Sequence, residues 1–213
     1  MFLDAMINGN NQILRFFGLP MQTNVLFIVK TSFVYGTLAF LFSMIGLSLP
    51  STVTYVVGNP LEVSNISVEH IVGHVVFGLI ASVLSLNLRY FILGGIFPIV
   101  LDADHLIQFL NLEMVPRMAH SIAFGFLASF VLLLLFGKRD YRLGCIAFTA
   151  IFAHISFDIL LGGTTMFPLL TPFVVKPVTF QGYDWIVIEI IAIAIVGVCT
   201  LIAKIEARKK LFV

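Results

Sequence analysis

Residues 143–161 read LGCIAFTAIFAHISFDILL, an apolar run that carries one histidine and one aspartate, His154 and Asp158. At about 1.5 Å per residue, a helix of this length spans the roughly 30 Å hydrocarbon core of a bilayer. The run is continuous and lacks the alternation of a β-strand, so it predicts a membrane-spanning helix. Because burying an ionisable group in lipid is costly, His154 and Asp158 mark a candidate functional site.

The composition of the whole chain is typical of a membrane protein. Of its 213 residues, 60% are hydrophobic and only 11% are charged, whereas a soluble domain is about half apolar and about a quarter charged. The net charge of +1 provides no basic field, so nucleic acid is not expected as a partner. Two cysteines, Cys145 and Cys199, lie in apolar runs without a C-x-x-C pair, so neither a disulfide framework nor a thiolate metal site is predicted.

Six apolar runs are long enough, or nearly so, to cross a bilayer. They are Thr31–Leu49, Val68–Leu86, Tyr90–Leu110, Ala119–Phe136, Leu143–Leu161 and Tyr183–Ala203. The predicted fold class is therefore all-α, a polytopic transmembrane helical bundle of about six spans. We expect one transmembrane domain over residues 31–203. Residues 1–30 before it suit either an interfacial segment or a poorly ordered terminus, and residues 204–213 form a basic tail.

The distribution of Lys and Arg predicts the orientation. With both termini cytoplasmic, ten of the twelve basic residues fall on the cytoplasmic side and only Arg117 and Lys176 fall outside. Cytoplasmic loops carry such an excess of positive charge. The expected location is thus the cell membrane, with several passes and an even number of spans.

Counting along the spans places the buried ionisable residues in one shallow layer beneath the outer face. The layer draws on four spans and contains His74, Asp102, Asp104, His105, His120, His154 and Asp158. The His154–Asp158 and Asp102–His105 spacings put each pair on one helical face. A divalent metal needs nitrogen and oxygen ligands that converge from separate elements, so the layer predicts a metal site.

Simpler interpretations exist for each member of this layer. His154 and Asp158 suit a hydrogen-bonded pair that joins two helices, Asp102 and Asp104 suit a solvated helix end, and His120 suits the interface. His70 lies at the water boundary and is assigned there rather than to the ligands. Glu189 is treated as an ordinary helix-end charge.

Four motifs resemble the YdjM-like inner-membrane proteins described as membrane-bound metal-dependent hydrolases. They are GHVVFG (73–78), LDADH (101–105), AHS (119–121) and AHISFDILLGGTTMFPLLTPF (153–173), and the match covers about residues 70–173. The chain departs from the family pattern at Leu101, which replaces a proline, at Val115, which replaces a histidine, and at Arg117, which is displaced by one position. The order of ligands is also distantly similar to zinc phospholipase C, which implies one or two metal ions and phosphoester chemistry.

The leading hypothesis is a membrane-embedded hydrolase that acts near the outer face on a membrane lipid or lipid-linked phosphoester. Zn²⁺ or a similar divalent ion would activate water and polarise the scissile group. The residues expected to hold it are His74, Asp102, His120, His154 and Asp158. Asp104 is the candidate general base, and His105 binds metal or protonates the leaving group. Ser121, Thr164 and Thr165 are expected to support the ligands. The alternatives are a metal-stabilised protein without catalysis and an ion- or solute-binding transporter.

Overall fold

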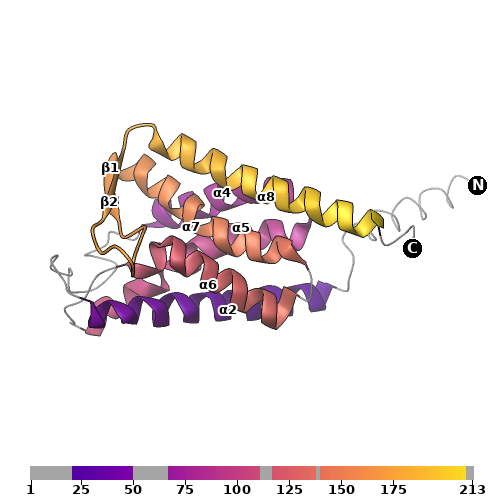
Figure 1. The fold of residues 1–213 in the computed structure, drawn as a ribbon, viewed down its shortest axis with the longest axis horizontal. Coiled ribbons are helices and arrows are strands. Elements are labelled where there is room, and N and C mark those ends of the chain that lie inside the picture. The colour runs from indigo at the N-terminus through magenta and orange to yellow at the C-terminus, as the bar shows by residue number, and fades with distance from the viewer. Residues whose placement is uncertain (1–20, 50–66, 111–116, 138–139, 210–213) are drawn as a thin grey trace, which may run out of the picture.

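The computed structural model describes residues 21–49, 67–110, 117–137 and 140–209, and these form a helical bundle with one short hairpin (Figure 1). The predicted all-α bundle is confirmed. In chain order the elements are α2 (Met21–Ser43), η1 (Met44–Ser48), α4 (Val68–Ser82), η2 (Val83–Ser85), α5 (Leu88–Leu101), η3 (Asp102–Leu110), η4 (Met118–His120), α6 (Ile122–Leu132), η5 (Leu133–Gly137), α7 (Tyr141–Gly162), β1 (Thr164–Phe167), β2 (Val178–Gln181) and α8 (Asp184–Lys209).

Five helical segments are long and apolar enough to cross a membrane, and a sixth apolar helix is shorter. The five are Asn24–Ser48, Val68–Ser85, Leu88–Leu110, Tyr141–Gly162 and Asp184–Lys209, and the shorter one is Ile122–Gly137. All six correspond to the runs predicted from the sequence. The helix bounds differ mainly at the ends of the chain, because α2 already begins at Met21 and α8 continues to Lys209. Residues 1–20 of the interfacial segment and 210–213 of the tail lie outside the described residues.

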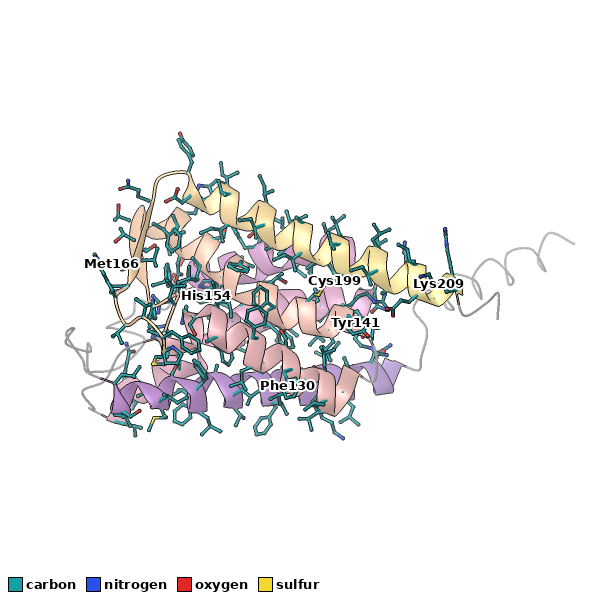
Figure 2. All side chains as sticks on the ribbon, viewed as in Figure 1. Phe130, Tyr141, His154, Met166, Cys199 and Lys209 are labelled. Carbon is teal, nitrogen blue, oxygen red and sulfur yellow. A yellow bond between two sulfur atoms is a disulfide. The ribbon has the colours of Figure 1, made fainter. Side chains whose placement is uncertain are left out.

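Helix α7 is the centre of the bundle. Its most apolar stretch is 78% buried within the protein, against 28% for α2 and for α8. It packs against α4, α5, α6 and α8. The outer helices instead present apolar side chains such as Phe33 and Phe130 to their surroundings, and Figure 2 shows Phe130 pointing away from the bundle. Polar groups on α7 are therefore enclosed by protein rather than by lipid.

Helices α4 and α5 approach each other closely through glycine. A Cβ atom placed on Gly78 would lie 2.0 Å from the Gly94 carbonyl oxygen, and one on Gly94 would lie 2.2 Å from Ser82 Oγ. Small residues permit this contact because membrane helices associate by close packing of their backbones. The crossing holds the histidines of α4 beside the end of α5.

The end of α5 changes its hydrogen-bonding pattern just where the polar residues begin. Pro98 lies inside the helix, and Asp102 starts the tighter 3₁₀ segment η3. The Asp102 backbone N–H bonds to the Ile99 carbonyl, three residues back, instead of to Pro98, four residues back. The Pro98 carbonyl is consequently positioned to accept a hydrogen bond from a neighbouring helix.

The segment after α7 forms an antiparallel hairpin in which Thr164 pairs with Gln181 and Phe167 with Val178. The sequence predicted that this proline-containing loop is not helical throughout, and the hairpin agrees. Gly163 leaves α7 with a φ of 70°, a left-handed value that glycine adopts easily. The hairpin lies at one end of the bundle, whereas α2 begins and α8 ends at the other (Figure 1).

The two cysteines correct the expectation that no disulfide forms. Cys145 on α7 and Cys199 on α8 are joined by a bond between their sulfur atoms, with 6.7 Å between their Cα atoms. They are 54 residues apart in the chain. Their pairing depends on the packing of α7 against α8, which cysteine spacing alone does not reveal.

Candidate metal centre

All five histidines of the chain converge at the hairpin end of the bundle together with three aspartates. They come from elements that are separate in sequence, and Figure 2 shows His154 toward the hairpin end, well away from Tyr141 at the start of the same helix. The contributors are His70 and His74 from α4, Asp102, Asp104 and His105 from η3, His120 from η4, and His154 and Asp158 from α7. The predicted convergence of four spans is confirmed.

The Asp102 carboxylate lies between two sets of imidazoles. Its Oδ1 atom is 3.2 Å from His105 Nε2, 3.4 Å from His154 Nε2 and 3.8 Å from His120 Nε2. Its Oδ2 atom is 3.5 Å from His70 Nε2 and 3.9 Å from His74 Nε2. Oδ1 is buried and has no hydrogen-bond partner in the described part of the chain. A buried carboxylate oxygen of this kind needs a cation or a donor nearby.

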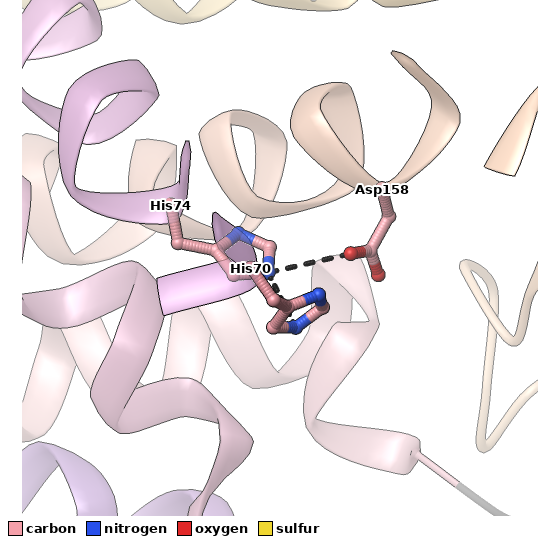
Figure 3. A group of neighbouring side chains, drawn as sticks. All are labelled: His70, His74 and Asp158. Atoms are coloured by element: carbon pink, nitrogen blue, oxygen red, sulfur yellow. Dashed lines mark hydrogen bonds and ion pairs between the residues drawn. The ribbon is translucent and has the colours of Figure 1, made fainter. Parts of the chain in front are cut away.

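Asp158 is arranged in the same way on the facing helix. Its Oδ1 is 3.3 Å from His74 Nε2 and its Oδ2 is 3.4 Å from His154 Nε2. Figure 3 shows contacts from the His74 ring to both Asp158 and His70, and the Nε2 atoms of the two histidines are 3.0 Å apart. The rings of His74 and His154 stack with centroids 3.8 Å apart. The imidazoles thus form one compact group with their Nε2 atoms directed inward.

The hydrogen-bond partner of an Nδ1 atom indicates whether the Nε2 atom of the same ring carries a proton or a lone pair. His154 Nδ1 donates to the Pro98 carbonyl over 2.8 Å, and a carbonyl only accepts, so we assign the ring proton to Nδ1. His120 Nδ1 faces Asp104 Oδ2 at 3.4 Å, which favours the same tautomer. Burial, and next the Arg117 guanidinium, lowers the pKa of His120 and keeps its ring neutral. Both rings then present Nε2 lone pairs to each other at 2.9 Å.

Two facing lone pairs at that distance repel unless a cation lies against both of them, a place that the Arg117 guanidinium takes in this structure and that a metal ion could also take. Four overlapping triads have ligand atoms within 4.8 Å of one another: His70, His74 and Asp158; His74, Asp102 and His154; His120, His154 and Asp158; and Asp102, Asp104 and His105. Imidazole and carboxylate ligands suit Zn²⁺ and related divalent ions. The hydrogen bond from His154 Nδ1 to the Pro98 carbonyl is also typical of metal-binding histidines, because it fixes the ring and its tautomer.

Asp104 is the most enclosed carboxylate of the group, with 1% of its surface exposed. Its Oδ2 accepts a hydrogen bond from Ser43 Oγ at 3.2 Å, and Ser43 in turn accepts from the Ala119 N–H at 3.0 Å. Its Oδ1 has no hydrogen-bond partner among the described residues. Helix α2 thereby supports the site through Ser43, a contribution that no local pattern in the sequence indicates.

Arg117 brings a positive charge into the group. Its Nη2 donates to Asp158 Oδ2 at 2.8 Å and lies 3.2 Å from His120 Nε2 and 3.5 Å from His154 Nε2. Burial alone would lower the pKa of Arg117, but Asp158 and the other carboxylates outweigh burial and raise it. The guanidinium also lies over the Phe167 ring, 5.2 Å from its centroid. Arg117 is therefore a permanent cation within the cluster.

The residues expected to support the ligands take different positions. Ser121 caps α6, where its Oγ accepts a hydrogen bond from the Phe124 N–H. On β1, Thr164 is exposed and Thr165 is half-buried. Among the contacts of the described residues, neither threonine has a hydrogen bond to the cluster. From that strand it is Phe167 that reaches the site, stacked 5.9 Å from the His120 ring. The supporting role of these three hydroxyl residues stays a prediction.

Sequence reasoning missed two members of the site. His70 was assigned to the water boundary, although it has only 8% of its surface exposed and lies one helical turn before His74. The signal in the sequence that points to His70 is its spacing of four residues from His74, which puts both rings on one face of α4. Arg117 was noted only as a departure from a motif and as a basic residue outside the cytoplasmic face.

Comparison with known protein families, curated proteins and solved structures finds no match to this chain. The geometry of the cluster is therefore the basis on which its function is argued.

Proposed function

We propose that this chain is a membrane-embedded, metal-dependent hydrolase that acts near the outer membrane face on a lipid or lipid-linked phosphoester. The observation that carries the proposal is the convergence of all five histidines and three aspartates at one end of an apolar bundle. Retaining so many ionisable groups there is costly, which favours a functional reason for keeping them. The motif resemblance to YdjM-like proteins supports the same proposal.

The number and exposure of the donors favour a catalytic centre over a structural one. A structural zinc site is closed by four ligands, whereas a catalytic site keeps an open position. Here eight candidate donor residues surround the centre. The cluster is partly exposed at Asp102 and Arg117, whose side chains are 11% and 27% exposed. A polar substrate group has a route to the ligands from this exposed part of the cluster.

The proposed roles follow from the positions of the side chains. His74, His120, His154, Asp102 and Asp158 would hold the ion, and the structure adds His70. When bound, a divalent ion supplies Lewis-acid polarisation of a phosphoryl oxygen and makes water more acidic. Asp104 would accept the proton from water through Oδ1, the oxygen that Ser43 does not engage. His105, 3.2 Å from Asp102, would bind the ion or protonate the leaving group.

The placement of the site at one end of the bundle favours a substrate with a polar head and an apolar tail. We propose that this end faces outward, with α2 beginning and α8 ending on the cytoplasmic side, as the basic residues suggest. A lipid headgroup would meet the cluster from the interface while its acyl chains stay beside the apolar helices.

The test is hydrolysis by the purified protein in mixed micelles. Phosphatidylglycerol and a polyprenyl phosphate serve as probes, with ³¹P NMR to detect cleavage after loading with Zn²⁺ or Mn²⁺ and after chelation. Asp104→Asn should retain the ion and lose turnover, and His74→Ala should lose both. Asp140→Asn, a matched loss of one carboxylate at the other end of α7, should change neither. Turnover that survives chelation, or that persists in Asp104→Asn, contradicts the proposed mechanism.

A structural metal site is the second candidate, because the ligands come from four separate segments that an ion would tie together. It differs from the first in a measurable way. A purely structural ion would stabilise the wild type and Asp104→Asn equally, and neither would hydrolyse any probe. Comparing thermal unfolding with turnover in the same samples separates the two.

A further inference from the structure

Asp102 and Asp158 each direct their two oxygens to different histidine pairs. One half of the centre contains His70 Nε2, His74 Nε2, Asp102 Oδ2 and Asp158 Oδ1, with imidazole-to-carboxylate distances of 3.3 to 3.9 Å. The other contains His120 Nε2, His154 Nε2, Asp102 Oδ1 and Asp158 Oδ2, with distances of 3.4 to 3.8 Å. We call these the α4 half and the α7 half.

The two halves have matching donor sets. Each has two imidazole nitrogens in mutual contact, at 3.0 Å in the α4 half and 2.9 Å in the α7 half. Each also has one oxygen from each of the same two carboxylates. A carboxylate that presents its oxygens to two separate nitrogen pairs is arranged to bridge two cations. One cation alone, whether a metal ion or a charged side chain, would leave the other imidazole pair without a positive charge beside its nitrogens.

Arg117 already provides a cation for the α7 half. Its Nη2 lies within 3.5 Å of three of the four ligand atoms there, namely His120 Nε2, His154 Nε2 and Asp158 Oδ2. For the α4 half, the contacts of the described residues include none to this guanidinium. Two side chains therefore distinguish the otherwise matched donor sets: Arg117, and His105, whose Nε2 atom lies 3.2 Å from Asp102 Oδ1 in the α7 half.

Charge balance also supports a divalent ion in the α4 half with Arg117 in the α7 half. Asp102, Asp104 and Asp158 bring three negative charges into a buried site, and the guanidinium brings one positive charge. One divalent ion in the α4 half then completes neutrality. A second divalent ion in the α7 half would be repelled by the guanidinium a few ångström away, so it must displace Arg117 first. The Arg117 side chain is 27% exposed, so it is not fully enclosed by the cluster.

We propose that the centre is built for two cations bridged by Asp102 and Asp158, and that Arg117 is the resident cation of the α7 half and competes there with a second divalent ion. The proposal rests on the metal centre of the proposed function but not on its hydrolytic activity. Arg117 thereby decides whether the centre holds one ion or two. It acts as a positioning residue, since it controls the ions rather than the reacting atoms.

The experiment counts Mn²⁺ ions bound to the chelator-treated protein in detergent. Equilibrium dialysis with elemental analysis gives the number bound, and electron paramagnetic resonance reports magnetic coupling between bridged ions. Wild type should bind one ion, with a second only at concentrations higher by roughly tenfold or more. Arg117→Gln should bind two ions of similar affinity and show a coupled spectrum. Arg117→Lys, which keeps the charge, should stay closer to wild type.

Two further variants locate the effect. Adding His70→Ala to Arg117→Gln should return the protein to one ion and abolish the coupling, because it removes a ligand of the α4 half. Arg89→Gln is the matched control, since Arg89 is also a partly buried arginine, bonded to Asn24 at the far end of the bundle. It should leave the wild-type titration unchanged. Arg117→Gln with the wild-type stoichiometry, or two ions without coupling, would overturn the proposal.

A measurement on the wild type alone covers the case in which Arg117→Gln fails to fold. Phenylglyoxal modifies accessible arginines, and mass spectrometry assigns the modified position. Arg117 should be protected with one Mn²⁺ bound and become reactive as the second ion enters, while Arg89 keeps a constant reactivity. Unchanged protection of Arg117 throughout the titration overturns the proposal. An unchanged stoichiometry in an active hydrolase refutes only this inference, whereas the expected stoichiometry without turnover refutes only the proposed activity.

Discussion

Both ends of α7 lie beside clustered polar side chains, but the hydrogen bonds of the described residues satisfy them at only one end. At the start of the helix, the Asp140 carboxylate accepts hydrogen bonds from Tyr90 Oη at 2.8 Å and from Arg142 Nη2 at 2.8 Å, and it caps the helix through the Arg142 N–H. Near its other end, Asp102 Oδ1 is buried and has no hydrogen-bond partner among the described residues, and His120 Nε2 faces His154 Nε2 at 2.9 Å.

The difference separates two reasons for keeping polar groups in an apolar chain. Asp140 needs nothing beyond the protein, so it stabilises the fold by itself. The cluster at the hairpin end is complete only with additional positive charge, part of which Arg117 supplies. An incompletely satisfied buried network is costly, and its persistence is therefore a better indicator of ligand binding than the presence of histidines alone.

The largest expected effect is the loss of metal binding on Asp102→Ala. Because Asp102 faces both imidazole pairs, its removal should weaken Zn²⁺ binding by more than about 100-fold, beyond the 10- to 100-fold typical of a residue that only supports a ligand. Competition with a chromogenic chelator measures the affinity. Asp140→Ala serves as the control and should bind Zn²⁺ normally. Equal Zn²⁺ affinities of Asp102→Ala and Asp140→Ala would contradict the assignment of metal binding to the hairpin end alone.

Removal of the ion should destabilise the wild type next most strongly. An ion that binds only the folded protein at 100 times its dissociation constant contributes about 2.7 kcal/mol to the free energy of unfolding. Thermal unfolding in detergent, followed by circular dichroism with and without a chelator, measures the shift. His74→Ala should show little response to the chelator, because it lacks a ligand to the ion. A wild type that melts at the same temperature in both conditions would argue against bound metal.

Tyr90→Phe tests the satisfied end and should have a smaller effect. Deleting the hydroxyl removes one hydrogen bond to Asp140, and it should lower the free energy of unfolding by about 1 kcal/mol. Denaturant titration measures this loss, and Zn²⁺ affinity should stay at the wild-type value. A change in metal affinity would mean that the two ends of the bundle are coupled.

The smallest expected effect is the pH dependence contributed by Asp140. Burial alone would raise the pKa of this carboxyl, but hydrogen bonds from Arg142 and Tyr90 outweigh burial and lower it. Its stabilisation is thus present above the unfolded-state pKa of about 3.9 and is lost as pH falls through the lower folded-state value. The pair is partly exposed, so the contribution is under about 1 kcal/mol.

Asp140→Asn isolates that contribution because asparagine still caps the helix. The difference in melting temperature between wild type and variant should be largest near neutral pH and should close below about pH 4. A difference that stays constant down to acidic pH would assign the effect to the cap rather than to the charge.

Much of the fold could be predicted because hydropathy is a strong signal in a chain of this composition. The run at 143–161 corresponds to α7, and helical spacing placed His154 and Asp158 on one face. Positions within the bundle were harder, because they depend on tertiary packing. The pairing of Cys145 with Cys199 and the support of Asp104 by Ser43 arise from contacts between segments distant in sequence, which no local pattern records.

The site was predicted in outline for a similar reason. Ionisable residues in apolar runs stand out, and counting residues brought those of four spans to one depth. The same counting misplaced His70, because depth along a helix says nothing about which face a side chain occupies relative to its neighbours. Arg117 was overlooked because its place in the cluster depends on the left-handed backbone conformation at that residue, with a φ of 56°, just before η4.

The hydrogen bond from His154 to the Pro98 carbonyl has a mechanical consequence. Pro98 lies one helical turn before Asp102, so α5 carries both the acceptor that orients the imidazole and the carboxylate that faces it. A tilt of α5 moves these two points together and leaves their spacing intact. Because His154 is on α7, a tilt of α5 relative to α7 would shift both contacts of this ring at once, so the centre should be sensitive to helix tilt in bilayers of different thickness.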